Sequence, residues 1–351
     1  ILKATCGALD THTTYFTPSE ANQFLFQVQQ RLSGIGALLR DNLNGLQVIR
    51  IIDKSPAAIS GKLKLNDLII AVNKQPVVGM DIIEAVDLIR GETGTEVTLT
   101  LLRERNEKQG NSEKIDITLT RGDVIMEEER LEAFSEAFAD GEIGYIHLSS
   151  FYQDPPSQQT SSSSSLDLKK ALEKFQEEAP LKALIIDLRN NSGGILHQAV
   201  EIASLFITKG VVVSIKDHTG KVQHWRATDG KTAFDGPLVI LINRASASAA
   251  EIVAQALQDY GRALIIGDDH TFGKGSFQNF TLDATKDNKI NPQGEYKVTR
   301  GRYYTVSGKS PQLVGVQSDI VVPSLLCEMD VGEKFAKFPL ENDAISANFN
   351  D

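Results

Sequence analysis

The second half of the chain alternates short apolar runs with amphipathic segments, and this alternation constrains the fold more than any other feature. The apolar runs have the length of buried strands, and the segments between them repeat apolar residues at helical spacing. The expected strands lie at 144–148, 183–188, 211–216, 237–243 and 263–267, and the expected helices at 166–178, 196–208 and 249–259. Strands that alternate with helices in this way predict an α/β core.

Residues 34–122 differ from this pattern and predict a separate, compact module. Their short β-type runs lie at 34–39, 46–52, 68–72, 97–102 and 115–120. One helix is expected at Asp81–Arg90 and another, before the module, at about 19–32. The chain therefore divides into a helical segment at 1–33, the module at 34–122, the α/β core at 123–325 and a C-terminal extension at 326–351, where a further region is expected to begin.

Composition excludes several classes of function. The 351 residues carry a formal net charge of −10, which argues against binding to the phosphates of nucleic acid. The longest apolar runs are far shorter than the roughly 18–20 residues that cross a bilayer, so no transmembrane segment is expected. The two cysteines and six histidines show no metal-ligand spacing, and we expect neither a metal nor another cofactor.

Two stretches stand apart from the expected core. Thr160–Ser165 is a run of hydroxyl residues that follows two prolines, and its composition predicts a mobile surface loop. The sequence begins at Ile1 with no initiator methionine and no apolar leader, so we expect a fragment of a longer precursor.

A candidate nucleophile lies where the strand at 237–243 runs into the helix at 249–259. Small residues separate the two elements, so Ser248 falls at the strand-to-helix turn with its hydroxyl at the helix N-terminus. Converging N–H groups and the helix dipole assist a nucleophile at such a position. An alternative remains open, because Ser248 and Glu251 also have the spacing of a capping box, in which the serine only caps the helix.

A candidate general base lies just beyond the next expected strand. Lys274 stands between two glycines in Thr271–Gln278, and the returning strand is expected to bring it near Ser248. A lysine base must be neutral, so its pKa has to fall from about 10.4 toward 7–8, a shift that burial can supply. The alternative is a solvated lysine on a glycine turn.

A third candidate is a loop of donors for an oxyanion. The expected strand at 183–188 ends in Arg189-Asn-Asn-Ser-Gly-Gly194 before a helix, a turn whose N–H groups can point at an anion. An ordinary strand-to-helix turn explains the same residues equally well.

Taken in order along the chain, these segments resemble the carboxyl-terminal processing proteases of the bacterial tail-specific type. The resemblance rests on Leu188–Gly194, Ser246–Glu251 and Phe272–Gln278, and it covers nearly the whole chain. Further matching stretches lie at 9–16, 149–154, 301–308 and 316–323. One departure is Asp268–His270, a link one residue longer than usual in the family, which is expected to shift Lys274 slightly.

The resemblance implies a role for each residue of the site. Ser248 would be the nucleophile, Lys274 its general base and Gln278 the residue that orients the amine. The oxyanion hole would be formed by the backbone N–H groups of Ala249 and of Gly193 or Gly194. The supporting residues, with roles that the resemblance leaves less defined, would be Glu251, Asp259 and Thr271.

The resemblance also implies an architecture. The core would have the crotonase/ClpP-like α/β fold, with residues 1–33 packed beside it and the module at 34–122 inserted as a PDZ domain (α+β). In a PDZ domain a peptide C-terminus adds as a strand, and the N–H groups of a Gly-containing loop bind its carboxylate. That loop would be Gly34, Ile35, Gly36 and Ala37, and the pocket for an apolar last side chain would be lined by Ile82, Val86 and Ile89. Burial of these last three residues in the core is the alternative.

The sequence therefore predicts a serine endopeptidase that recognises protein C-termini through its PDZ domain and cleaves by a Ser-Lys dyad through an acyl-enzyme. The expected partners are proteins or peptides with accessible apolar C-termini, and an oligomer is compatible with the sequence. The family implies a location in the bacterial periplasm. Two alternatives remain open: a catalytically silent PDZ scaffold that only binds peptides, and an acyl-CoA enzyme, since crotonases share the core and an oxyanion hole.

Overall fold

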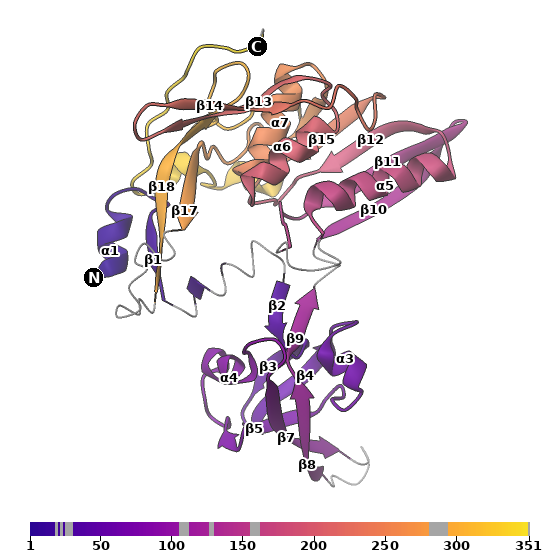
Figure 1. The fold of residues 1–351 in the computed structure, drawn as a ribbon, viewed down its shortest axis with the longest axis vertical. Helices are drawn as coiled ribbons and strands as arrows, with labels where there is room; N and C mark the ends of the chain where they lie inside the picture. Colours follow the sequence, from indigo (N-terminus) through magenta and orange to yellow (C-terminus); the bar gives the residue numbers. More distant parts are fainter. Residues whose placement is uncertain are drawn as a thin grey trace. The chain divides into compact units, whose positions relative to one another are not determined.

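The computed structural model describes residues 1–17, 20, 21, 24, 31–104, 112–125, 130–154, 162–280 and 294–349. The chain forms two compact units, a smaller one of Gln30–Glu127 and a larger one of Ile1–Gln29 together with Glu128–Asp351 (Figure 1). Each unit has its own cluster of buried apolar side chains. Within the described ranges, no helix is both long and apolar enough to cross a membrane.

The larger unit is built on a six-stranded sheet in the order β10-β11-β12-β15-β16-β19. Strands β11 to β19 of this order run parallel to their neighbours, and β10 pairs antiparallel to β11 at one edge. The strands are β10 (Leu131–Phe138), β11 (Gly141–Leu148), β12 (Leu181–Asp187), β15 (Leu238–Ile242), β16 (Leu264–Gly267) and β19 (Ile320–Val321).

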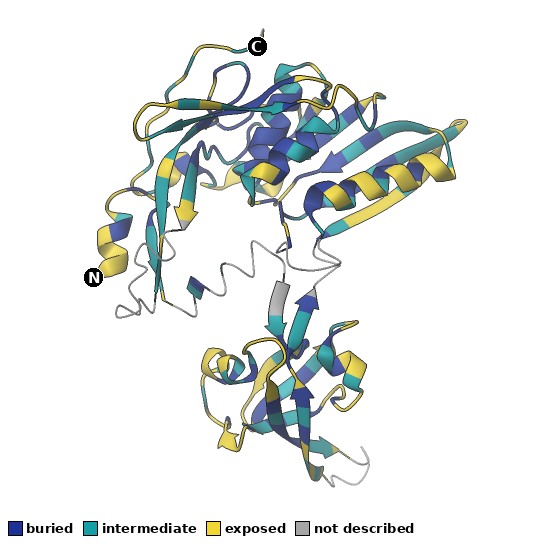
Figure 2. Cartoon of the chain, viewed as in Figure 1, coloured by how far each residue is buried: buried dark blue, intermediate teal, exposed yellow. Residues whose placement is uncertain are grey.

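Three helices cover one face of this sheet, and the side-chain pattern of the strands explains which face (Figure 1). Ile146, Ile186, Ile240 and Ile265 are neighbours in register across four strands, and all are fully buried. Figure 2 shows buried segments, in dark blue, in the strands and helices of this unit. Because alternate residues of a strand share a face, this row defines the covered side. The helices are α5 (Ser164–Glu178), α6 (Leu196–Ser204) and α7 (Ala249–Asp259). The α/β core expected from the sequence is confirmed.

A second, antiparallel sheet of the larger unit joins parts of the chain that are far apart in sequence. Its order is β1-β18-β13-β14, and β17 also pairs with β18. The strands are β1 (Thr14–Phe16), β13 (Gly210–Asp217), β14 (Val222–Ala227), β17 (Ser276–Phe280) and β18 (Glu295–Tyr304). Shorter elements of the same unit are α1 (Leu2–Gly7) and the 3₁₀ helices η2 (Leu325–Glu328) and η3 (Glu333–Phe335). The expected C-terminal extension thus belongs to the larger unit.

The smaller unit is mostly β and carries two short helices. Its main sheet has the order β3-β4-β5-β7-β8, with β6 paired to β5, and a separate ladder joins β2 to β9. The strands are β2 (Arg31–Gly34), β3 (Ala37–Asn42), β4 (Gly45–Ile51), β5 (Leu68–Val72), β6 (Gln75–Pro76), β7 (Glu96–Glu104), β8 (Ser112–Thr120) and β9 (Gly122–Ile125). The helices are α3 (Pro56–Ser60) and α4 (Ile82–Ile89).

The helical segment expected at 1–33 is wrong in part. Strand β1 lies within it, and the helix expected at about 19–32 cannot reach its predicted end because Arg31–Gly34 forms β2. Residues 20, 21 and 24 are helical, and the rest of the expected helix before Arg31 lies outside the described residues. Both strands pair with partners distant in sequence, β18 and β9, and no local sequence pattern predicts these pairings.

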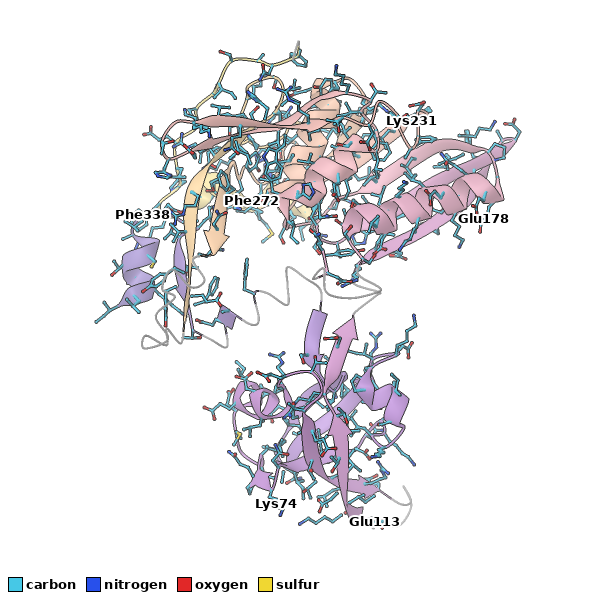
Figure 3. The ribbon with its side chains drawn as sticks, in the orientation of Figure 1. Lys74, Glu113, Glu178, Lys231, Phe272 and Phe338 are labelled. Atoms are coloured by element: carbon cyan, nitrogen blue, oxygen red, sulfur yellow. The ribbon has the colours of Figure 1, made fainter. Side chains whose placement is uncertain are left out.

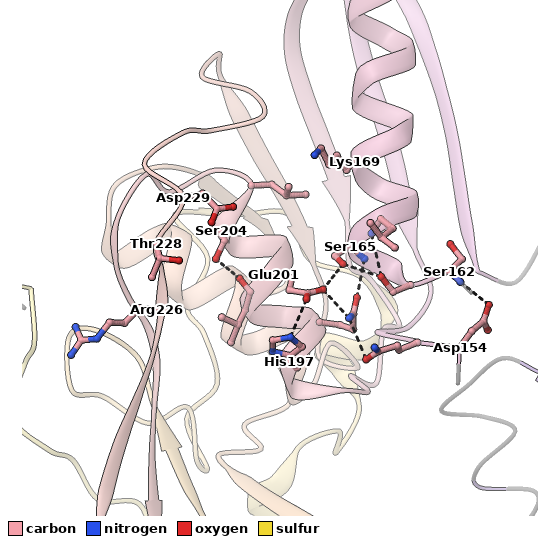
Figure 4. A pocket seen from close by; sticks show the side chains of 16 residues that line it. Asp154, Ser162, Ser165, Lys169, His197, Glu201, Ser204, Arg226, Thr228 and Asp229 are labelled. Carbon is pink, nitrogen blue, oxygen red and sulfur yellow. Dashed lines mark hydrogen bonds and ion pairs between the residues drawn. The ribbon is translucent and has the colours of Figure 1, made fainter. Parts of the chain in front are cut away.

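The serine tract expected to be a mobile loop is structured at its end. Ser163 caps α5 by accepting a hydrogen bond from the Leu166 N–H, and Ser164 and Ser165 are buried in the first turn. The Ser165 hydroxyl donates to Glu201 on α6, on the wall of a cavity of about 580 Å³ (Figure 4). Residues 160 and 161 lie outside the described residues. Composition misled here because serine serves helix caps as well as loops.

Candidate active site

Ser248 occupies the turn between β15 and α7, at the N-cap position of the helix. Its backbone has φ 57° and ψ −114°, a conformation that residues with side chains rarely adopt and that marks a strained position. Gly193 lies directly against it, since a Cβ built on Gly193 would come 2.7 Å from the Ser248 Cβ. The surroundings therefore hold the serine in one strained backbone conformation. Such conformations are concentrated at functional sites.

The amine of Lys274 lies beside this hydroxyl. The Lys274 Nζ is 3.4 Å from the Ser248 Oγ, at the long end of a hydrogen bond. Burial, with a smaller contribution from the charge of Lys297, lowers the pKa of Lys274 to about 8. A neutral amine in contact with a hydroxyl is the arrangement that proton transfer requires. The longer link at Asp268–His270 does not carry the lysine out of reach.

Glu251 joins the Ser248 turn to the segment that carries the lysine. This fully buried carboxylate accepts hydrogen bonds from the Ser248 N–H at 2.7 Å and the Lys274 N–H at 2.9 Å. It also accepts from the Gly273 N–H at 2.7 Å and the Thr271 hydroxyl at 2.6 Å. Burial raises the pKa of Glu251 to about 7, while its four donors act in the opposite direction. Ser248 is thus both the residue at the helix cap and the partner of Lys274.

Every backbone polar group of Phe272–Gly275, the base segment, has a hydrogen-bond partner. The partners of the N–H and C=O groups, in order, are Ser246 and Glu333 for Phe272, Glu251 and Leu313 for Gly273, Glu251 and Tyr303 for Lys274, and Gln312 and Tyr303 for Gly275. Phe272, which opens the segment, is labelled in Figure 3. The position of the lysine is therefore fixed from several distant parts of the larger unit.

Tyr303 is a residue of the site that sequence analysis missed. It is buried near the end of β18, where its hydroxyl donates to the Lys274 carbonyl and lies 3.2 Å from the Ser248 carbonyl. Burial raises the pKa of Tyr303 well above its usual range, so the hydroxyl stays a donor. Its stretch, 301–308, matched the family, but no pattern distinguished this tyrosine from its neighbours.

The glycine loop after β12 lies against the start of α7. A Cβ built on Gly193 would come 3.1 Å from the Ala249 nitrogen, which brings two of the three expected oxyanion donors to one place. The Gly193 N–H, however, donates to the Asn191 Oδ1 at 2.8 Å. Gly194, the third expected donor, lies against the backbone of Phe151.

Two expected site residues are directed elsewhere. The Gln278 side chain donates to the hydroxyls of Ser276 and Thr299, and in the described part of the chain no hydrogen bond joins it to Lys274. A register shift between Phe277 and Gln278 pairs Gln278 with Thr299 of β18, which is one of these two partners. Asp259 lies at the opposite end of α7 from Ser248, where it accepts from the Thr305 hydroxyl at 2.5 Å.

In the smaller unit, the expected peptide-binding residues divide into buried and accessible ones. Ile35 and Gly36 are buried, and their carbonyls accept from the Ala57 and Ile52 N–H groups. On α4, Ile89 belongs to the core, so the alternative interpretation is correct for that residue. Gly34 is buried as well, and the residues that stay partly accessible are Ala37, Ile82 and Val86. Strand β3 forms one edge of the sheet among the described strands.

Within the residues that the structure describes, no group of three His, Cys, Asp or Glu side chains is placed to hold a metal ion. The chemistry available to the site is that of a serine hydroxyl, a lysine amine and backbone N–H donors. An α/β unit with such a site, joined to a β unit with an open edge strand, is the arrangement expected of a peptidase with an attached peptide-binding module.

Comparison with known families agrees with this class. The model of peptidase family S41 matches residues 142–322, and a PDZ domain model matches residues 47–103. The chain belongs to peptidase family S41. The family resemblance stated from the sequence is confirmed.

The chain is 35% identical over 338 residues to the tail-specific protease of Haemophilus influenzae, covering 95% of this chain and 46% of that one. It is 34% identical over 325 residues to the carboxy-terminal-processing protease of Bartonella bacilliformis, covering 92% and 68%. The chain thus spans about half the length of the first relative. Among solved structures, a photosystem II D1 C-terminal processing protease has a similar fold, with a TM-score of 0.51, 24% identity, and coverage of 92% and 80%.

Proposed function

We propose that this chain is a serine endopeptidase that selects substrates by their C-termini and cleaves them with a Ser-Lys dyad. The observation that carries the proposal is the 3.4 Å contact between the Lys274 Nζ and the Ser248 Oγ. The pKa of Lys274, lowered to about 8 by burial, makes a useful fraction of the amine neutral near pH 7–8.

The residues of the site have consistent roles in this reaction. As the Ser248 Oγ attacks the substrate carbonyl, its proton passes to the neutral Lys274 amine. The N–H groups of Ala249 and of Gly193 or Gly194 would stabilise the oxyanion that forms. The protonated lysine then gives its proton to the leaving amine, which departs and leaves an acyl-enzyme. Lys274 next deprotonates a water molecule, whose attack on the acyl-enzyme breaks the ester bond. The lysine then returns this proton to the Ser248 Oγ as the acid leaves.

Substrate selection is assigned to the smaller unit. An extended C-terminal peptide would pair with β3, the edge strand, and present its carboxylate to the N–H groups of Gly34–Ala37. The carbonyls of Ile35 and Gly36 already bond within the unit, so the carboxylate would approach the other side of the loop. Ile82 and Val86 would contact an apolar last side chain.

The wider setting remains a set of predictions. Proteins or peptides with accessible apolar C-termini are the expected partners, and the family suggests the bacterial periplasm. The crotonase/ClpP-like description of the core and the orienting role of Gln278 also stay predictions. In the present geometry Gln278 would have to turn away from Ser276 and Thr299 to reach the amine.

The proposal is tested with an unstructured polypeptide that ends in an apolar residue. We expect the wild-type chain to hydrolyse it, Ser248→Ala to lose about 10³-fold or more in kcat, and an amidated C-terminus to slow processing. Undiminished turnover by Ser248→Ala would remove the dyad. Saturable peptide binding without turnover would favour the silent scaffold, and saturable binding of a CoA thioester the acyl-CoA enzyme.

A further inference from the structure

Glu333, at the start of η3, is a fully buried carboxylate that the mechanism above does not use. It lies in the C-terminal extension, and no sequence motif singles it out. The His12 Nε2 lies 2.8 Å from its Oε2 and 3.0 Å from its Oε1. The Gln312 Nε2 donates to the same Oε1 at 3.2 Å.

Glu333 reaches both ends of the base segment. Its N–H donates to the Phe272 carbonyl at 2.9 Å, at the start of the segment. At the other end, the Gly275 N–H donates at 2.8 Å to the Oε1 of Gln312, whose amide in turn donates to Glu333. Lys274 lies between these two attachments, so a displacement of Glu333 would be felt on both sides of it.

His12 is itself anchored. Its backbone N–H donates to the Asp10 Oδ1 at 2.8 Å, and the Thr299 hydroxyl of β18 donates to the same atom at 2.9 Å. The His12 side chain is 16% exposed, so its contact with Glu333 is largely shielded from solvent. The pair therefore joins the N-terminal segment to the C-terminal extension behind the base segment.

We propose that Glu333 and His12 are positioning residues that hold Lys274 at the distance from Ser248 that proton transfer needs. This inference rests on the proposed function, because it assumes that Lys274 is the general base. The two residues do not touch the reacting atoms. They act through the base segment and through the charge that Glu333 places near the amine.

The charge of Glu333 allows a test in which the direction of the change in the pKa of Lys274 is predicted. The charged groups that act on the amine are Lys297 from β18, Glu251 from α7 and Glu333 from η3. The two carboxylates raise the pKa of Lys274, and Lys297 lowers it. Removing the Glu333 charge should therefore lower that pKa, a result that loosened packing alone would not produce.

The first experiment is the pH profile of kcat/KM for Glu333→Gln. Activity rises with pH as Lys274 loses its proton, and we expect this limb to move to lower pH by about half a unit or more. The matched control is Asp343→Asn, the same kind of change in the same extension. Asp343 bonds to Lys216, Arg302 and Tyr304, away from the base segment, so its limb should stay in place.

The second experiment compares His12→Ala with His12→Gln. Loss of the donor in His12→Ala should lower kcat about 10-fold, with KM within about two-fold, because the base is misplaced while peptide binding is untouched. The amide of His12→Gln can stand where the ring Nε2 stood and should restore most of the rate. Thermal unfolding of each variant at the assay pH shows whether it is folded.

The outcomes separate this inference from the proposed function. Three results would overturn the positioning role. The rising limb of the pH profile could stay in place in Glu333→Gln, or it could shift equally in Asp343→Asn. The third such result is a wild-type kcat in His12→Ala. If Glu333→Gln does not fold, the His12 variants decide alone. Retained activity in Ser248→Ala would instead overturn the dyad and leave the His12–Glu333 contact as a structural link only.

Discussion

The base segment and the loop Gly34–Ala37 are both built around glycines, yet the protein holds them in opposite ways. In Phe272–Gly275 every backbone polar group is bonded, to partners from distant parts of the larger unit. The loop is tied inward through the carbonyls of Ile35 and Gly36, and it leads into an edge strand that has room for another. A base loses its effect when it is misplaced by about 1 Å, whereas a recognition loop has to admit a peptide.

The largest effect is expected in the base segment, in the variant Lys274→Met. Turnover should fall about 10³-fold or more because the base is lost. Stability should rise, because the pKa of Lys274, about 8 when folded, is below the value of about 10.4 expected when unfolded. The folded state thus disfavours the charged amine by up to about 3 kcal/mol below pH 8, and this penalty shrinks toward zero as pH rises to about 10.4.

Denaturant unfolding at pH 7 and at pH 10.5 measures that gain, which should be present at the first pH and absent at the second. Lys169→Met, on an exposed face of α5, is the matched control and should show no gain. If Lys274→Met is no more stable than wild type at pH 7, the base segment does not hold its lysine in a desolvated position.

The next effect is expected where Glu251 ties the segment to the Ser248 turn. In Glu251→Gln an amide NH₂ would face N–H donors that now point at a carboxylate oxygen. We expect kcat to fall about 100-fold and the free energy of unfolding to fall by about 2–4 kcal/mol. Thr271→Ser, which keeps the hydroxyl donor to Glu251, should retain far more activity than Thr271→Val. Equal losses in the two threonine variants would count against this role of the carboxylate.

A smaller and different effect is expected in Gly34–Ala37, the loop proposed to bind the peptide carboxylate. Gly36 has φ +77°, and a Cβ there would come 2.1 Å from the Ser55 Cβ, so Gly36→Ala should distort the loop. We expect KM for a peptide with a free C-terminus to rise about 10-fold while kcat stays within about two-fold. Gly79→Ala, at φ +75° with open space around it, controls for backbone strain alone. A fall in kcat in Gly36→Ala as large as that expected in Glu251→Gln would contradict the difference between the two regions.

The smallest effect is expected outside both regions, at the cap of α5. Ser163→Ala should lower the free energy of unfolding by about 1 kcal/mol and leave kcat and KM unchanged. Chemical denaturation and steady-state kinetics on the same preparation check both statements. A changed kcat would show that the cavity beside α5 is coupled to the reaction.

The meeting of Ser248, Gly193 and Lys274 could be predicted because each follows a strand of one parallel sheet. Strands β12, β15 and β16 are neighbours, so the residues after them gather at one edge of the sheet. The contact of Gln278 with Thr299 could not be predicted, because it depends on a register shift between β17 and β18 that the apolar pattern does not show. Tyr303 and Glu333 were missed because their contacts arise from pairings and turns far from the base segment in sequence. Local periodicity carries no information about such contacts.

The ladder between Arg31–Gly34 and Gly122–Ile125 gives the smaller unit neighbouring points of entry and exit. A cassette whose two ends lie side by side can be exchanged or deleted without rerouting the rest of the polypeptide. A chain in which a short flexible bridge joins residue 30 to residue 126 should therefore keep its larger unit folded. Recombination at this ladder would exchange the smaller unit, and with it the proposed peptide specificity, while the larger unit stays the same.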